Sequence, residues 1–249
     1  MITCNIVGGL GNQLFQIFAT ISYALEHNQQ FGFTIKPFTG KRPMYWDNFL
    51  NSLKIFTCSS ETPLVLKGYF QNEKYFINYY CSICRLIRLK QQKELLMQEY
   101  EYLLGGDTIT CSMHFRLGDY LQLPEHYIIL SYEYYKNSLD FICKREKERL
   151  SEIKVIYFCE DTIPFIDRLT SEFPNITFIC AQNELSDWQQ MLLMSCCNHN
   201  IIANSTFSWW GAYFNSNPDK IVCSPAKWYG PKITIDIETE RTPFGWNLI

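Results

Sequence analysis

Hydrophobic positions along the chain alternate between two spacings. Short apolar runs, typical of buried strands, are followed by longer segments in which apolar residues recur every three or four positions, as on one face of a helix. The predicted strands are 2–7, 31–36, 108–113, 154–158, 175–180 and 200–203, and the predicted helices begin at 12 and cover 74–104, 131–150 and 187–196. This alternation predicts an α/β protein with mainly parallel sheets.

The same pattern predicts two domains. Two glycines and an aspartate at 105–107 separate the helical segment from the next strand and mark a boundary. We therefore expect an N-terminal domain over 1–105 and a C-terminal domain over 106–249, with the tail after about residue 230 packing back on the first domain. A chain of 249 residues is long enough to bury a sizeable core.

The most informative run is His-Phe-Arg-Leu-Gly-Asp-Tyr at 114–120, directly after a predicted strand. Ligands of open α/β sheets bind at the carboxyl ends of strands. The guanidinium of Arg116 presents a planar fork of donors that suits a diphosphate. The alternative is a strand-terminal arginine held in a surface ion pair with Asp119, and the run alone does not decide between the two.

A second run, Gly-Gly-Leu-Gly-Asn-Gln at 8–13, joins the first predicted strand to a helix. Glycines such as Gly9 and Gly11 let the backbone approach a ligand, and the amides of Asn12 and Gln13 suit sugar hydroxyls. The third spaced glycine of a dinucleotide fingerprint is missing, which argues against a nicotinamide or flavin site. The alternative is an ordinary strand-to-helix turn.

A third run, at 200–212, again predicts a buried strand, a polar corner and a helix. Asn204 forms the corner, and Ser205 and Thr206 stand where a helix N-cap belongs. Their hydroxyls and the first amides of the helix predict a site for an anion that needs no metal. The alternative is a plain N-cap followed by Trp209 and Trp210 in the core.

Together these runs resemble the α-1,2-fucosyltransferase family. The resemblance also includes Gly-Tyr-Phe-Gln-Asn-Glu-Lys-Tyr-Phe at 68–76 and Phe-Cys-Glu-Asp at 158–161, and its anchors occur in order between residues 6 and 212. It implies a GT-B fold, in which two Rossmann-like domains face each other across a cleft. It also implies inverting transfer of L-fucose from GDP-fucose to a hydroxyl of a galactose-containing glycan, with no divalent metal or other cofactor.

The resemblance assigns roles to individual residues. Arg116 would hold the donor diphosphate with Ser205 and Thr206, His114 and Asp161 would lie near the guanosine, and the loop at 8–13 would form the acceptor side. For catalysis we expect Arg116 to stabilise the leaving group and Asp119 to act as the general base. Asp119 as a structural partner of Arg116, and His126 as the base, remain alternatives.

The sequence also departs from the family. Leu117 stands where a second arginine is common, so one positive charge near the donor is missing. Either GDP-fucose binding is weaker, or another basic residue, for example Lys227, supplies that charge. The segments 36–68 and 120–131 are short for the family, which leaves the acceptor open. Alternative functions are fucosyl transfer with another linkage or to a peptide, and a non-catalytic protein that binds a nucleotide or glycan.

Composition adds few constraints. A net charge of −3 argues against a nucleic-acid partner. Eleven scattered cysteines without a second spaced pair predict reduced core thiols rather than a zinc site. The chain shows no signal peptide and no membrane-spanning run, so we expect a cytoplasmic protein or a truncated chain. For the segment 79–93, a core-facing helix is favoured over one that lies on a membrane.

Overall fold

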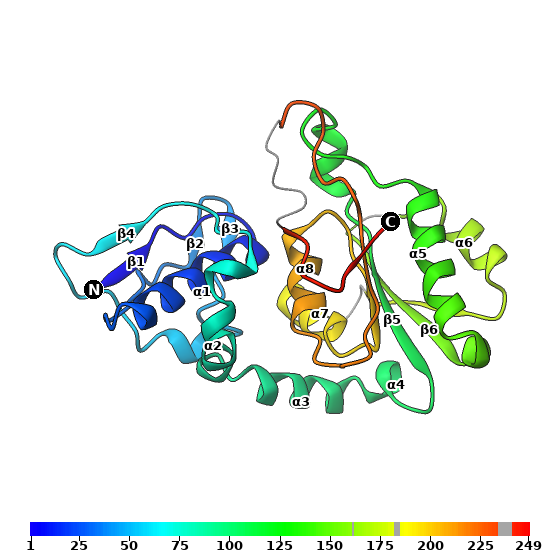
Figure 1. Cartoon of the computed structure of the whole chain (residues 1–249), viewed down its shortest axis with the longest axis horizontal. Helices are drawn as coiled ribbons and strands as arrows, with labels where there is room; N and C mark the ends of the chain where they lie inside the picture. Colours follow the sequence, from blue (N-terminus) through cyan, green and yellow to red (C-terminus); the bar gives the residue numbers. More distant parts are fainter. Residues whose placement is uncertain (161, 182–184, 234–240) are drawn as a thin grey trace. The chain divides into compact units, whose positions relative to one another are not determined.

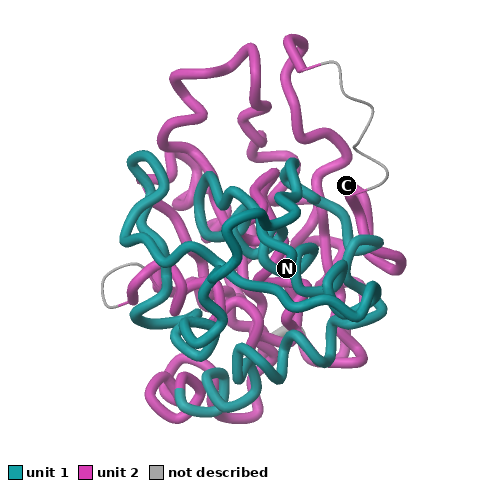
Figure 2. Tube along the Cα trace, turned by 90° about the vertical axis from the view of Figure 1, so that its left-hand side faces the viewer, with its two compact units in different colours: residues 1–95 teal, residues 96–249 magenta. Residues whose placement is uncertain are grey.

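The computed structural model describes residues 1–160, 162–181, 185–233 and 241–249, without the side chains of residues 150 and 151. The chain forms two compact units, Met1–Leu95 and Leu96–Ile249 (Figure 2). The division falls inside a helix, ten residues before the glycine pair at which we predicted the domain boundary. Within the described residues, no helix combines the length and the apolar content that crossing a bilayer requires.

The first unit is built around one long helix and a few short strands. Its elements are β1 (Ile2–Cys4), α1 (Leu10–Glu26), β2 (Phe38–Thr39), β3 (Arg42–Pro43), the 3-10 turn Asn51–Leu53, β4 (Leu64–Leu66), the 3-10 turns Glu73–Tyr75 and Ile77–Tyr79, α2 (Tyr80–Leu86) and α3 (Leu89–Glu99), which continues into the second unit. β1 pairs in parallel with β4 on one side and makes a single parallel bridge to Phe31 on the other. The predicted strand 31–36 is therefore wrong as a ladder, since isolated bridges at Phe31 and Phe33 are its only pairings with described residues.

Apolar side chains of the predicted helix 79–93 point into the protein. Ile83 and Ile87 are fully buried, as a core-facing helix requires. The helix breaks at Arg88, whose φ of 54° lies in the left-handed region and separates α2 from α3.

The second unit is a doubly wound α/β domain. Its elements are α4 (Glu101–Leu104), β5 (Ile109–His114), a 3-10 turn at Gly118–Gln122, α5 (Tyr132–Arg145), a 3-10 segment at Lys147–Glu152, β6 (Ile153–Phe158), α6 (Ile166–Glu172), β7 (Thr177–Cys180), α7 (Asp187–Met194), β8 (His199–Ile201), α8 (Thr206–Tyr213), β9 (Val222–Ser224) and β10 (Asn247–Leu248). All pairings in its described sheet are parallel, and the strand order is β10-β9-β8-β5-β6-β7. The predicted α/β class with mainly parallel sheets is confirmed.

This strand order reverses between β5 and β8. From β5 the chain moves outward through β6 to β7, and then returns to β8 on the opposite side of β5. In open α/β sheets the ligand crevice forms at such a reversal, outside the carboxyl ends of the two strands. The topology therefore directs attention to the residues that follow β5 and β8.

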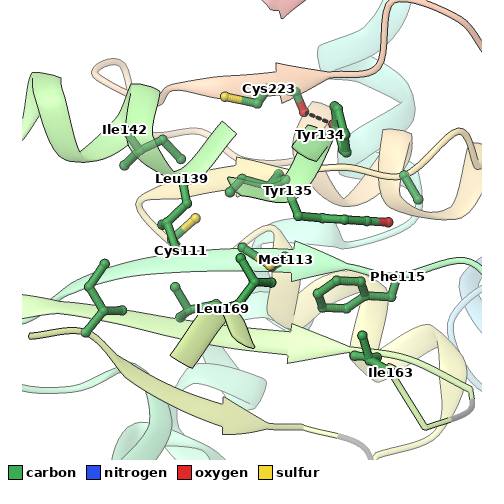
Figure 3. Close-up of a cluster of buried hydrophobic side chains, with 14 of the residues drawn as sticks. Cys111, Met113, Phe115, Tyr134, Tyr135, Leu139, Ile142, Ile163, Leu169 and Cys223 are labelled. Carbon is green, nitrogen blue, oxygen red and sulfur yellow. Dashed lines mark hydrogen bonds between the residues drawn. The ribbon is translucent and has the colours of Figure 1, made fainter. Parts of the chain in front are cut away.

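Alternation along β5 sends side chains into two different layers. Cys111 and Met113, with Phe115 just beyond the strand, join a buried cluster with Leu139 and Ile142 of α5 (Figure 3). The intervening residues of β5 point to the opposite face of the sheet. α5 and α6 cover one face, and α7 and α8 cover the other (Figure 1).

The chain's last described residues belong to the second unit. β10 pairs with β9, and the indole Nε1 of Trp209 donates to the carbonyl of Arg241 at 2.9 Å. We predicted that the tail after about residue 230 packs on the first domain. Residues 241–249 belong to the second unit, and residues 234–240 lie outside the described ranges, so packing of the tail on the first domain stays a prediction.

Candidate functional site

The register of the sheet aligns three polar residues at its carboxyl edge. β5 pairs with β6 at an offset of 44 residues, from Ile109 to Ile153, and with β8 at an offset of 88, from Cys111 to His199. Continued past the end of β5, these offsets bring Arg116 level with Glu160 and Asn204. One row of side chains therefore crosses the point at which the strand order reverses.

Side-chain contacts of Arg116 confirm that these residues lie close together. Arg116 Nη1 donates to Glu160 Oε1 at 2.6 Å, and its Nη2 donates to Asp119 Oδ1 at 2.5 Å. The guanidinium also lies over the ring of Tyr120, with Cζ 4.9 Å from the centroid. The Tyr120 hydroxyl in turn donates to the Asn204 carbonyl at 3.2 Å. The two runs that we singled out in the sequence thus meet in space.

The fork of Arg116 is occupied on both sides by carboxylates. Burial has the largest single influence and lowers the pKa of Arg116. The contacts with the two carboxylates act in the opposite direction and leave the pKa above its usual value. The ion pair with Asp119 is the structural alternative that we left open from the sequence. It is now part of the geometry that any role of Asp119 as a base must accommodate.

Asn204 connects the corner to neighbouring loops. Its side chain is buried, and Nδ2 donates to the carbonyls of Ile128 and Trp228 at 2.8 and 2.9 Å. Ser205 is the N-cap of α8, and its hydroxyl accepts from Phe207 N at 3.3 Å. α8 therefore begins directly after Asn204, with Thr206 as its first residue, and Asn204 is linked to Arg116 through Tyr120.

His114 lies under this corner, at the end of β5. Its ring centroid is 5.5 Å from that of Phe207 in the first turn of α8. Nδ1 of His114 and Oδ1 of Asn204 are both enclosed, and neither has a hydrogen-bond partner in the part of the chain that the structure describes. Of the predicted donor residues, His114, Arg116, Asn204 and Ser205 therefore gather at one corner; Asp161 lies outside the described residues.

Glu160 is the residue that our sequence reasoning missed. The run at 158–161 drew attention to Asp161, yet the register with β5 puts Glu160 level with Arg116. The signal that could have found it is equal distance from the strand ends. Arg116 lies two residues past the end of β5, and Glu160 lies two residues past the end of β6.

The glycine run of the first unit forms a tight turn held by amide side chains. Gly8 has a φ of 87°, and a Cβ atom there would lie 2.7 Å from Asn12 Nδ2, so this position requires glycine. Gln16, which is fully buried, pairs with both the N–H and the carbonyl of Val7, as a neighbouring strand would. This explains why β1 ends at Cys4, before the predicted residue 7.

Two of the predicted acceptor-side residues carry structural contacts. Gln13 is fully buried and donates to the carbonyls of Gly8 and Pro43 at 2.9 and 2.8 Å. Asn12 Oδ1 accepts from Gln71 Nε2 at 2.7 Å, which joins the glycine run to the run at 68–76. Gln13 therefore fixes the loop from inside, and Gly9, Gly11 and Asn12 remain the predicted residues of the acceptor side.

Comparison with known proteins identifies the family. The family model described as Glycosyl transferase family 11 matches residues 33–247, well over half of the chain. The chain belongs to glycosyl transferase family 11. The match includes the runs at 68–76, 114–120 and 200–212, whereas the glycine run precedes it. The resemblance to α-1,2-fucosyltransferases found in the sequence is thereby confirmed.

Individual relatives carry related names. An Escherichia coli "O-antigen biosynthesis glycosyltransferase WbnK" is 30% identical over 76% of this chain and 63% of its own length. An Escherichia coli "Alpha-1,2-colitosyltransferase" is 30% identical over 65% of this chain and 55% of its own length. The chain thus spans less than two thirds of these relatives. A solved structure, NodZ α-1,6-fucosyltransferase co-crystallised with GDP, covers 85% of this chain and 91% of its own at 12% identity, with a TM-score of 0.44.

In this family 11 chain, His114 gives a testable pH dependence. Burial, and secondarily the charge of Arg116, lower the pKa of His114 from 6.5 to about 3. Because His114 takes up a proton more readily in the unfolded than in the folded state, acid favours unfolding. The contribution of neutral His114 to stability is complete above pH 6.5 and is lost progressively as the pH falls towards 3. Between pH 7.5 and pH 5 we expect this residue to account for a loss of about 2 kcal/mol.

Urea unfolding of the second unit at both pH values measures this loss. The His114→Gln variant should lose about 2 kcal/mol less than the wild-type protein between pH 7.5 and pH 5. His27→Gln, at an exposed position, is the matched control and should behave as the wild type does. Equal acid sensitivity in the wild type and in His114→Gln would contradict the expectation.

Proposed function

We propose that this chain is an inverting glycosyltransferase that moves L-fucose from GDP-fucose to a hydroxyl of a galactose-containing glycan, forming an α-1,2 linkage. The observation that carries the proposal is the arrangement at the reversal of strand order. There Arg116 lies beside the corner Asn204–Ser205 and the first turn of α8. A guanidinium and a helix N-terminus at one strand edge form a site suited to a nucleoside diphosphate.

The chemistry explains why such a site is useful. When GDP leaves the sugar, negative charge builds up on the diphosphate, and fixed donors that face this charge lower the barrier. In the proposed reaction, a phosphate replaces one or both carboxylates on the fork of Arg116. Ser205, Thr206 and the leading amides of α8 bind the same diphosphate, and His114 and Asp161 lie towards the guanosine.

Asp119 is the proposed general base. For Asp119→Asn we expect kcat to fall about 10²- to 10⁴-fold, while the KM for GDP-fucose changes little, because proton removal belongs to the reaction step. Steady-state kinetics with varied donor measure both constants. A raised donor KM with nearly unchanged kcat would assign Asp119 to the positioning of Arg116 instead, as their 2.5 Å contact also permits.

The proposed mechanism has no step for a divalent metal. Treatment with excess EDTA should leave the initial rate of fucosyl transfer unchanged, since the positive charge at the diphosphate comes from protein donors. The control is addition of Mg²⁺ or Mn²⁺ to the treated enzyme, which should not raise the rate. A rate that falls with EDTA and returns with metal would contradict this part of the proposal.

Names of the relatives favour one alternative donor. Colitose is L-fucose without one ring hydroxyl, and one relative is named as a colitosyltransferase. Transfer of colitose by the same site is therefore the second candidate. A different linkage, a peptide acceptor and a non-catalytic nucleotide- or glycan-binding protein are the remaining alternatives.

An acceptor array tests the proposal. The protein is incubated with GDP-fucose or GDP-colitose and a set of glycans that end in galactose, and linkages are read by mass spectrometry. We expect α-1,2-fucosylated products. Binding of GDP without transfer to any acceptor would favour the non-catalytic alternative, and no binding of GDP would reject the proposal.

A further inference from the structure

The charges described at the proposed donor corner do not favour an anion. Arg116 contributes one positive charge, and its two partners, Asp119 and Glu160, contribute two negative charges. His114 is neutral there, because burial lowers its pKa to about 3. A diphosphate that approaches this group meets a net negative charge unless another cation takes part.

Arg241 is a second guanidinium bordering the same corner. Its backbone carbonyl accepts from Trp209 Nε1, so the residue is fixed to α8, the helix that begins at the corner. Its Cζ lies 4.9 Å from the ring centroid of Trp228 and 5.1 Å from that of Tyr229. The carbonyl of Trp228 accepts from Asn204 Nδ2 at 2.9 Å. Asn204 of the corner directly precedes the N-cap Ser205, and its side chain is hydrogen-bonded to Trp228, the residue whose ring packs against Arg241.

The charge of Arg241 is not neutralised by the described protein. Arg241 is 3% exposed, and its enclosed Nε has no hydrogen-bond partner among the described residues. Among residues 1–160, 162–181, 185–233 and 241–249, no carboxylate pairs with it. A buried cation that no described carboxylate neutralises is unfavourable, and the two aromatic rings offset only part of that cost. An anionic ligand would supply the missing partner.

A row of tyrosines connects the two guanidinium groups. The rings of Tyr229 and Tyr127 have centroids 6.2 Å apart, and Tyr127 stacks on Tyr120 at 4.1 Å with an interplanar angle of 11°. Arg116 lies over Tyr120 at one end of the row, and Arg241 lies against Tyr229 at the other. The corner residue Asn204 borders the row through the hydroxyl of Tyr120.

We propose that Arg241 binds a phosphate of the donor nucleoside diphosphate and supplies the second positive charge of this site. The inference rests on the proposed function and deepens it. Lys227, the basic residue that the sequence suggested for this charge, is exposed, whereas Arg241 is buried beside the corner. Its planar fork also suits a phosphate better than an ammonium group does.

Nucleotide binding tests the inference. Affinities for GDP are measured by calorimetry, and those for guanosine by ligand-observed NMR, in the wild-type protein and in Arg241→Gln. We expect Arg241→Gln to weaken GDP binding about 10- to 100-fold, the scale for losing hydrogen bonds to a charged group. Guanosine binding should stay within about twofold, because guanosine carries no phosphate.

Two further variants make the result decisive. Lys227→Gln removes the same charge from an exposed neighbour and should bind GDP as the wild type does. Arg241→Lys keeps the charge without the fork, and it should bind GDP at least about fivefold more weakly than the wild type even where Arg241→Gln fails to fold.

The possible failures are distinguishable. Wild-type GDP affinity in both Arg241 variants would overturn the inference while leaving the proposed function intact. An equal loss of GDP and guanosine binding would show that Arg241 only supports the fold, and would overturn it too. No binding of GDP by the wild-type protein would reject the proposed function, and the inference with it.

Discussion

Replacing Arg116 with alanine is expected to lower the turnover of sugar transfer by roughly 10²- to 10³-fold or more. This is the scale for removing one preorganised donor that faces charge developing in a transition state. This guanidinium lies at the reversal of strand order, and its position is fixed by Glu160, Asp119 and the ring of Tyr120. Initial rates with GDP-fucose and a galactose-terminated acceptor measure the effect.

Arg116→Lys should be nearly as harmful, because a lysine keeps the charge but not the bidentate fork. Arg168→Ala is a suitable control, since Arg168 is an exposed arginine whose carboxylate partner, Glu172, is on the same helix, α6. That variant should keep the wild-type rate. Near-normal turnover of purified, folded Arg116→Ala protein would remove the phosphate role from Arg116.

Replacing Phe115 with alanine should have a large effect of a different kind. Phe115 is 1% exposed, and the centroid of its ring lies 4.3 Å from that of Tyr135 and 5.9 Å from that of Phe165. Loss of a buried phenyl ring leaves a cavity, so we expect the free energy of unfolding of the second unit to fall by about 3–5 kcal/mol. Chemical denaturation followed by circular dichroism measures this change.

Phe115→Leu is the matched variant, because it fills most of the cavity and should cost clearly less. Turnover per folded molecule should change much less in either Phe115 variant than in Arg116→Ala. An unchanged stability of Phe115→Ala would show that the second-unit core tolerates a void at this position. The alternation of β5 indicates that Phe115 serves the core and Arg116 the site, and that result would contradict this division.

Much of the second unit was readable from the sequence. The runs 108–113 and 154–158 correspond to β5 and β6 within one residue at each end, because each alternates residues that face the two sides of a largely buried sheet. Ser205 was predicted as an N-cap and is one, since its hydroxyl accepts from Phe207 N. Such local signals depend on short-range hydrogen bonds and survive without knowledge of the fold.

The first unit was less readable. The strand predicted at 2–7 ends at Cys4, because the side chain of Gln16 replaces a neighbouring strand for Val7. The segment 31–36 has the composition of a strand but finds only isolated bridges. Whether an extended segment forms a ladder depends on partners that are distant along the chain, and local pattern does not contain them.

The sequence by itself determined the family, the α/β class and the two runs that contain Arg116 and Ser205, because glycines, caps and apolar periodicity act over a few residues. Only the tertiary structure decided that Glu160 and Asp119 both occupy the fork of Arg116, and that Arg241 borders the same corner. The contact with Glu160 spans 44 residues along the chain and arises from the register of parallel strands. Parallel pairing joins segments through long crossovers, so its register is fixed by packing of the whole domain rather than by any local run of residues.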